Sequence, residues 1–251
     1  MTRLLAPLML SALVVLAGCN SSADNSTTAA APSAPVAAVA APNGGDWTTI
    51  VAATPDGGYL KGNPNAPVKL VEYGALSCPH CAHFSQESHD ELGAMIKSGK
   101  FSYELRPFLV HPQIDLPATL LAECNGAETF FPLAEQMFAR QEDWFGAEKF
   151  KALTPDVQKA WATMTPNQLA ADVADRLGLV TFVEARGVSA DKAKACLADK
   201  TGIERLTAMM NTADAKYHVT GTPTFVLNGA VVADVNDWDK LKPKVKAALG
   251  G

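Results

Sequence analysis

The sequence predicts an α/β fold in which a β-α-β unit and a β-β-α unit are separated by a helical insertion. Three observations predict it. A β-rich run that stops at Gly74 is followed by a helical pattern and then by an alternating run over residues 101–107. Far downstream, Asn228-Gly229 joins two short apolar runs, and residues 113–216 between these halves contain helix start signals but no clear strand.

The first half has the pattern of a parallel β-α-β unit. Residues 68–74 combine β-branched, leucine and tyrosine side chains, which suits a buried strand. Over residues 79–98, large apolar side chains recur at helical spacing, and Lys97 with Gly99 supplies a stop signal. Residues 101–107 then alternate apolar with polar side chains, as a half-buried strand does.

The C-terminal half has the pattern of a hairpin followed by a helix. Asn228-Gly229 is a strong hairpin signal because both central residues of a type I′ turn need positive φ. The flanking runs over 224–227 and 230–232 are the two expected strands. Residues 236–249 then form the closing helix, in which Pro243 is the weak point.

The insertion contains two helix start signals. Thr165-Pro166-Asn167-Gln168 is a capping box with proline at the first helical position, and Gly178 is the matching stop. Thr201 with Glu204 predicts a second capping box and a second helix.

The N-terminus predicts export and anchoring. Residues 1–18 contain one charge followed by an apolar run too short to span a bilayer, which is the pattern of a signal peptide. Its end, Leu16-Ala17-Gly18-Cys19, resembles the bacterial lipobox, so Cys19 would become a lipidated N-terminus; the alternative is an ordinary signal peptide with an incidental cysteine. Residues 19–45 are mostly small or polar and predict a flexible tether.

Composition limits the possible partners. The 251 residues are 48% hydrophobic, which is ample for a buried core, and the formal net charge is −5. An acidic chain without a basic stripe lacks the field that attracts phosphate backbones, so nucleic acid is not expected as a partner.

Cys78-Pro79-His80-Cys81 follows the first predicted strand and opens the helix after it. A cysteine at a helix N-terminus faces amides without internal partners and the positive end of the dipole, which lowers its pKa below the free value of about 8.5. Pro79 takes a position that needs no N–H, and His80 adds a donor or a charge. We therefore expect Cys78 to be the exposed attacking sulfur and Cys81 the buried resolving sulfur, with no cofactor needed.

This motif after an apolar strand resembles the active site of the DsbA family of exported disulfide oxidoreductases. Residues 61–68 and the pair Glu72-Tyr73 also look like the lead-in of lipoprotein relatives, and the resemblance covers about residues 55–250. It implies a thioredoxin fold with an inserted helical domain, divided into residues 46–112, 113–216 and 217–251. It also implies that the chain introduces disulfides into extended cysteine-containing segments of exported proteins.

The resemblance assigns roles to further residues. Glu72 stands six residues before Cys78, where the family keeps a buried acid beneath the resolving cysteine; a surface carboxylate is the alternative. Gly221-Thr222-Pro223-Thr224-Phe225 resembles the loop whose cis proline faces the active site, so Thr222 and Pro223 would bind the substrate strand.

Cys124 and Cys196 are, by the same resemblance, a second disulfide within the insertion. The alternative is two unrelated buried thiols.

Rival functions remain open at this point. The same chemistry can run as an isomerase or a reductase, and a threonine at position 222 is commoner in the isomerase branch of the family. A rival of another class is a metal-binding lipoprotein with ligands at Cys78 and Cys81, although no second Cys-x-x-Cys is present. We expect a net oxidase of moderate strength, reoxidised by a membrane redox partner and anchored to a membrane facing the periplasm or cell exterior.

Overall fold

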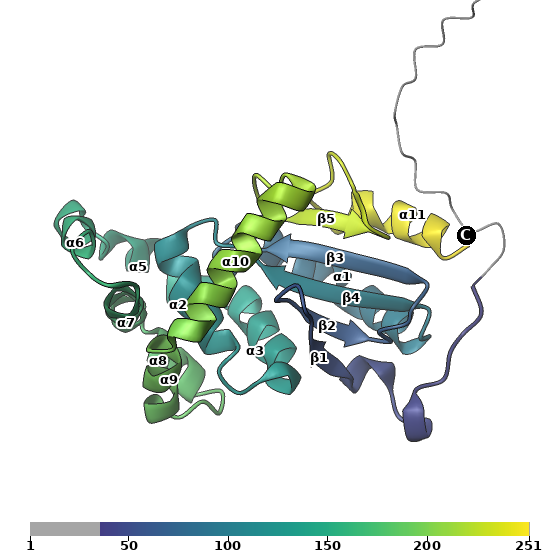
Figure 1. Cartoon of the computed structure of the whole chain (residues 1–251), viewed down its shortest axis with the longest axis horizontal. Coiled ribbons are helices and arrows are strands. Elements are labelled where there is room, and N and C mark those ends of the chain that lie inside the picture. Colours follow the sequence, from purple (N-terminus) through teal and green to yellow (C-terminus); the bar gives the residue numbers. More distant parts are fainter. Residues whose placement is uncertain (1–35, 251) are drawn as a thin grey trace, which may run out of the picture.

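The computed structural model describes residues 36–250 (Figure 1). The predicted signal peptide and Cys19 lie outside the described residues, and only the last ten residues of the predicted tether lie inside them. Those residues already contact the domain: Val39 donates its amide to Ser98 at 3.0 Å, and its carbonyl accepts from Trp47 Nε1 at 2.8 Å. Main-chain groups make these contacts, so the small and polar composition of the segment did not indicate them.

A mixed sheet forms the centre of the thioredoxin fold. Its strand order within the described residues is β1-β2-β4-β3-β5-β6. The strands are β1 Val51–Ala53, β2 Tyr59–Gly62, β3 Val68–Gly74, β4 Phe101–Pro107, β5 Thr224–Leu227 and β6 Ala230–Val231. Among these six strands only β3 and β4 pair in parallel, and β3 lies between β4 and β5 in the middle of the sheet.

The predicted β-α-β unit is confirmed. Helix α1 (Pro79–Lys97) connects β3 to β4, and the parallel register places Glu72 opposite Leu105. The predicted hairpin is also confirmed, with Leu227 opposite Ala230 and positive φ at Asn228 and Gly229. The closing helix α11 spans Trp238–Ala248.

Strands β1 and β2 were not predicted. They pair antiparallel with each other, and β2 also pairs antiparallel with β4, so they extend the sheet beyond the β-α-β unit. Each has only three or four residues, and the link between them contains Gly57 and Gly58. Such short strands carry no alternation from which to predict them.

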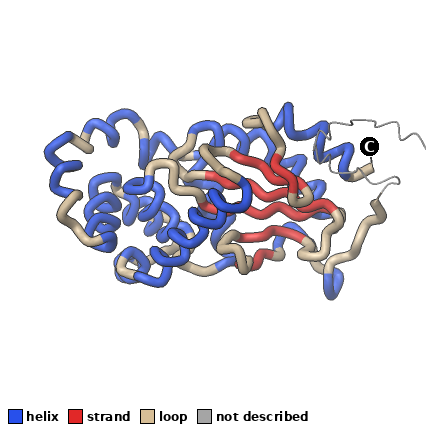
Figure 2. The backbone as a smooth tube through the Cα atoms, turned by 45° about the horizontal axis from the view of Figure 1, so that its top comes forward, coloured by secondary structure: helices blue, strands red, loops and turns tan. Residues whose placement is uncertain are grey.

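The insertion is helical, as expected. It comprises α2 Pro112–Ala122, α3 Ala127–Ala139, α4 Gln141–Phe145, α5 Ala147–Lys151, α6 Pro155–Trp161, α7 Pro166–Leu177, α8 Leu179–Glu184, α9 Ala190–Leu197 and α10 Lys200–Tyr217. Helices α5 to α9 lie beyond one end of the sheet, while α10 leads back towards β5 (Figures 1 and 2).

The two capping predictions have different outcomes. The capping box of Thr165 and Gln168 is present at the start of α7, and Gly178 ends that helix in the left-handed conformation. The box predicted at Thr201 is wrong, because Asp199 caps α10 by accepting from the Thr201 amide. Aspartate is itself a favoured N-cap, and here it starts the helix two residues earlier.

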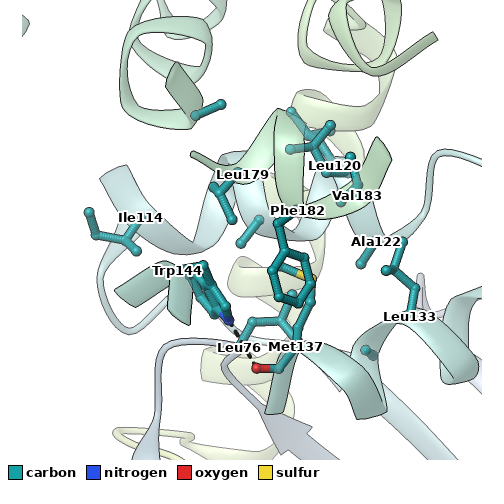
Figure 3. Packing of buried hydrophobic residues seen from close by; sticks show 14 of the residues in the cluster. Leu76, Ile114, Leu120, Ala122, Leu133, Met137, Trp144, Leu179, Phe182 and Val183 are labelled. Atoms are coloured by element: carbon teal, nitrogen blue, oxygen red, sulfur yellow. Dashed lines mark hydrogen bonds between the residues drawn. The ribbon is translucent and has the colours of Figure 1, made fainter. Parts of the chain in front are cut away.

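The described residues form two main hydrophobic cores. One packs α1 and α11 against the sheet through Phe84, Phe225 and Trp238. The other fills the helical insertion around Trp144, whose Nε1 donates to the Met137 carbonyl at 2.9 Å (Figure 3). The second core also includes Leu76, Cys78 and Cys81, so the insertion packs directly against the reactive turn.

Candidate active site

Cys78 is the N-cap of α1 and Pro79 is the first residue of the helix. The sulfur of Cys78 accepts the Cys81 amide at 3.4 Å, which satisfies one of the donors that a helix start leaves without a partner. A tight turn, in which the Cys78 amide donates to Ala75 at 3.0 Å, carries the chain from β3 into the helix. The predicted strand, turn and helix therefore place Cys78 at the positive end of the dipole.

Both thiols are free and buried, and Cys78 is more enclosed than the sequence suggested. Cys81 has no exposed surface, as expected, but Cys78 is only 5% exposed rather than open to solvent. When protonated, Cys78 donates to the Thr222 carbonyl at 3.4 Å, and the loop that contains Thr222 covers part of the sulfur. The prediction of an exposed Cys78 is therefore corrected, because tertiary packing of a distant loop limits its access.

The pKa values of the two sulfurs are shifted in opposite directions. The pKa of Cys78 is lowered to about 5, chiefly because the Cys81 side chain hydrogen-bonds to it. Burial opposes this change, while the Thr222 side chain and the amides of Cys81 and His80 add to it. Burial raises the pKa of Cys81 well above its usual value. Near neutral pH, Cys78 is thus a thiolate and Cys81 a thiol.

His80 contributes to this arrangement through its backbone. Its amide helps to lower the pKa of Cys78, while its side chain is exposed. Within residues 36–250, no hydrogen bond joins the His80 imidazole to either sulfur, so the side-chain donor expected from the sequence is not seen in this geometry.

Glu72 is a buried carboxyl group below the reactive pair. Only 1% of its surface is exposed, and burial raises its pKa to about 8. The Tyr103 hydroxyl donates to its Oε2 at 2.5 Å, which partly offsets that rise, while Oε1 has no hydrogen-bond partner among the described residues. A Cβ at Gly74 would lie 2.8 Å from Oε1, so glycine there leaves room for the carboxyl group.

The loop at residues 221–225 closes over the reactive turn. The Thr222–Pro223 peptide is cis, and Pro223 is buried. Thr222 contacts Cys78 through its carbonyl, while its hydroxyl oxygen is buried without a conventional hydrogen bond among the described residues. A hollow of about 590 Å³ adjoins the loop and is lined by Thr222, Pro223 and Val232, among others.

Several polar residues around the turn were missed. Tyr103 was seen only as a strand residue, although its alternation with Phe101 and Leu105 places it on one face of β4. No functional role was predicted for His111, but its Nδ1 lies 2.8 Å from Ser77 Oγ. Asp115 carried no sequence signal, since it makes its contacts with a segment 38 residues earlier in the chain.

Cys124 and Cys196 form a disulfide within the insertion, with their Cα atoms 5.8 Å apart. The pair links the end of α2 to α9 and is separate from the reactive turn. The part of the chain that the structure describes contains no cluster of three or more histidine, cysteine, aspartate or glutamate side chains arranged to hold a metal ion. None of its helices combines the length and apolar character that a membrane span requires.

The chain matches a family model described as Thioredoxin over residues 54–247. Among curated proteins, a Rickettsia bellii protein named as a protein-disulfide oxidoreductase is 30% identical over 170 residues, covering 67% of this chain and 56% of its own. The chain thus spans little more than half the length of that relative.

Solved structures show the same similarity. A structure from Novosphingobium aromaticivorans, described as a protein-disulfide isomerase, is 31% identical with a TM-score of 0.72 and covers 76% of this chain and 97% of its own. The Wolbachia pipientis alpha-DsbA1 structure shares the fold at 19% identity, with a TM-score of 0.59 over 76% of this chain and 90% of its own.

Proposed function

The chain belongs to the thioredoxin family, among its DsbA-like thiol-disulfide oxidoreductases, and on that premise we propose that it introduces disulfides into exported proteins by exchange at Cys78 and Cys81. The observation that carries the proposal is that the two sulfurs have pKa values shifted in opposite directions. Cys78 is held at a helix start with a pKa of about 5, next to a fully buried thiol of raised pKa. Stabilising the Cys78 thiolate favours the reduced enzyme, which makes its disulfide an oxidant.

The first step is attack on the enzyme disulfide. A client thiolate attacks the Cys78 sulfur, a bond forms between the two sulfurs, and the bond between Cys78 and Cys81 breaks. The electron pair of the broken bond goes to Cys81, whose raised pKa means that it takes up a proton.

The second step releases the client. A second client thiolate attacks the client sulfur of the mixed disulfide, and Cys78 leaves as a thiolate. A sulfur with a pKa of about 5 is a good leaving group because it needs no proton at neutral pH. Two electrons have passed from the client to the enzyme pair, and a membrane redox partner removes them to regenerate the disulfide.

Glu72 is proposed to supply the proton that Cys81 needs. With a pKa of about 8 it is mostly protonated at neutral pH, and the Cys81 side chain is among the groups that influence that pKa. Because the carboxylic acid is neutral before the exchange, Glu72 can hold a proton ready for Cys81 without a buried negative charge.

Thr222 and Pro223 are proposed to bind the client segment. Their loop lies against Cys78 and beside the adjoining hollow, where an extended chain can place a cysteine near the sulfur. The Thr222 hydroxyl has no other partner among the described residues, so it can donate to Cys78 once the thiolate forms.

The direction of exchange is the finer part of the proposal. The low pKa of Cys78 and the Pro79-His80 pair favour a net oxidase of moderate strength. Isomerase activity is the second candidate, because the Novosphingobium structure that is 31% identical is described as an isomerase.

Two substrates separate these activities. The oxidised protein is incubated with a reduced, unfolded model substrate and, in parallel, with a scrambled one. Fast oxidation with little unscrambling supports the oxidase, whereas efficient unscrambling together with a potential near that of thioredoxin, about −270 mV, contradicts it. Metal analysis of protein purified without chelator, combined with thiol titration, tests the metal-binding alternative.

Export and anchoring are proposed from the N-terminal residues. Cleavage before Cys19 and its lipidation would tether the enzyme to a membrane facing the periplasm or the cell exterior. Cys19→Ser should abolish fatty-acid labelling while the folded domain keeps its exchange activity. A wild-type chain that takes up no labelled fatty acid would contradict the anchor.

A further inference from the structure

We propose that Asp115, with His111 and Ser77, is a positioning network through which the helical insertion fixes the place of Cys78 and thereby sets the oxidising strength of the Cys78–Cys81 pair. The inference deepens the proposed function and rests on it. None of the three residues contacts the reacting sulfurs in the hydrogen bonds described above, so they act through the turn that carries Cys78 rather than on the exchange itself.

The network is built around one buried carboxylate. Asp115 Oδ1 accepts the Ser77 amide at 2.9 Å, and Oδ2 accepts the Ser77 hydroxyl at 3.0 Å and the His111 amide at 2.8 Å. Asp115 has no exposed surface. Burying a carboxylate is costly unless it is hydrogen-bonded, so these bonds hold the carboxylate and its donors in one arrangement.

His111 closes the network into a ring. The Ser77 hydroxyl has a single hydrogen, which it donates to Asp115, so its oxygen accepts from the His111 Nδ1–H at 2.8 Å. The same histidine donates its amide to Asp115. The backbone of His111 is therefore bonded to Asp115 and its ring to Ser77, the residue directly before Cys78.

A second side chain of the insertion holds the same turn. Gln141, at the start of α4, donates its side-chain amide to the carbonyls of Leu76 at 2.7 Å and Cys78 at 3.1 Å. Asp115 thus binds the amide of residue 77, and Gln141 binds the carbonyls on either side of it. Three consecutive residues before the helix are fixed by side chains from outside the sheet.

Fixing this turn matters because the stabilisation of a thiolate by a helix start is short-ranged. The dipole effect falls off within the first turn, and the Cys81 amide reaches the Cys78 sulfur at 3.4 Å. A turn that relaxes would weaken this contact. The negative charge of Asp115 has the opposite effect, because a nearby like charge disfavours a thiolate. The direction in which a substitution of Asp115 moves the pKa of Cys78 therefore separates positioning of the turn from charge repulsion.

The test uses Asp115→Asn in the full chain, with the thiolate followed by its ultraviolet absorbance and the redox equilibrium measured against glutathione. If Asp115 positions the turn, the pKa of Cys78 should rise by about one unit, and the equilibrium should shift about tenfold, or about 30 mV, towards a weaker oxidant. Gln141→Met removes the hydrogen bonds to the Leu76 and Cys78 carbonyls without changing the charge. It should shift the pKa of Cys78 and the redox equilibrium in the same directions as Asp115→Asn.

The matched control is Glu123→Gln. Glu123 follows α2 at the end opposite to Asp115, is also largely buried, and pairs with Arg205. Its substitution should lower the stability of the oxidised and reduced forms alike and leave the pKa of Cys78 and the redox equilibrium unchanged. A merely structural role for Asp115 would produce that same pattern in Asp115→Asn.

A pKa of Cys78 that falls or stays constant in folded Asp115→Asn overturns the proposal. If that variant does not fold, Ser77→Ala and Gln141→Met decide, because Ser77→Ala keeps the carboxylate and the backbone bond and removes only the hydroxyl; no shift in either variant also overturns it. These measurements need no client protein, so a failure of the proposed oxidase activity would be seen separately in the substrate assays.

Discussion

The Tyr103 hydroxyl donates a 2.5 Å hydrogen bond to Glu72 Oε2 across the parallel strands β4 and β3. Burial alone would leave the carboxyl group strongly opposed to ionisation, and this bond partly offsets that opposition. Tyr103 is itself partly buried, and its own pKa is raised well above the usual value, so its hydroxyl keeps the proton that it donates to Glu72. Tyr103 therefore helps to set the pH range over which Glu72 holds its proton.

Tyr103→Phe should raise the pKa of Glu72 further. A hydrogen bond to a charged group contributes about 1.5 to 3 kcal/mol, which corresponds to a rise of about one to two pKa units. The contribution of Glu72 to folding stability falls as pH rises from 4.5 to about 8, because its folded pKa lies above the unfolded one, and the variant should extend that fall to higher pH. Denaturation across this range measures the effect.

Tyr73→Phe is the matched control for this experiment. Tyr73 is adjacent to Glu72 in the chain, but its hydroxyl accepts from Arg106 instead. Tyr73→Phe should change folding stability without moving the pH range over which the Glu72 contribution falls. Identical pH profiles for Tyr103→Phe and the wild type would show that the phenol does not tune Glu72.

Cys81→Ala should accumulate mixed disulfides with client proteins. Cys78 remains able to attack a client disulfide and form a mixed disulfide, but Cys81 is no longer present to attack the Cys78 sulfur and release the client. Non-reducing gels of cells that express each variant reveal the adducts. Equal trapping by Cys78→Ala and Cys81→Ala would reverse or remove the assigned roles of the two sulfurs.

The elements that local patterns predicted are those whose signal lies within one segment. Strands β3 and β4, helix α1 and the turn at Asn228-Gly229 each depend on periodicity or turn chemistry that neighbouring residues carry. The position of Cys78 at the helix start follows from the same local pattern, because strand, turn and helix adjoin in the chain.

What the sequence could not predict depends on contacts between distant segments. The cover over Cys78 comes from a carbonyl 144 residues away, and the hold on Ser77 comes from a carboxylate 38 residues away. Strands β1 and β2 are too short for alternation and form because β4 offers an edge to pair with. A single sequence does not show which distant groups meet.

Replacing Cys124 and Cys196 together with serine should destabilise the protein without changing the reactive pair. The disulfide spans 72 residues, and a chain-entropy model assigns about 4 kcal/mol to a loop of that length. The free energy of unfolding should fall by that order, while the pKa of Cys78 stays the same. Mass mapping of the oxidised wild type that finds both residues as free thiols would contradict the disulfide.

The potential of the reactive pair should change its pH dependence near pH 5. Above that value, reduced Cys78 is a thiolate and only Cys81 carries a proton that oxidation releases. Below it, both sulfurs are protonated. For a two-electron pair, one proton gives a slope of about 30 mV per pH unit and two protons give about 59 mV. Glutathione equilibria measured at several pH values on both sides of 5 give the two slopes.

The folding stability of the reduced form should also depend on the titration of Cys78, and this contribution should fall as pH falls. The folded pKa of Cys78 is lowered to about 5 from the free value of about 8.5, so the thiolate stabilises the reduced form fully above that free value. That stabilisation should shrink as pH falls towards 5 and be absent below it, which denaturation of both redox forms can follow. In Cys81→Ala, the thiolate titration should move to higher pH, because the largest contribution to the low pKa comes from the Cys81 side chain. A titration midpoint near 9 in the wild type would mean that the helix start and its neighbours do not stabilise the thiolate, and the oxidase proposal would lose its physical basis.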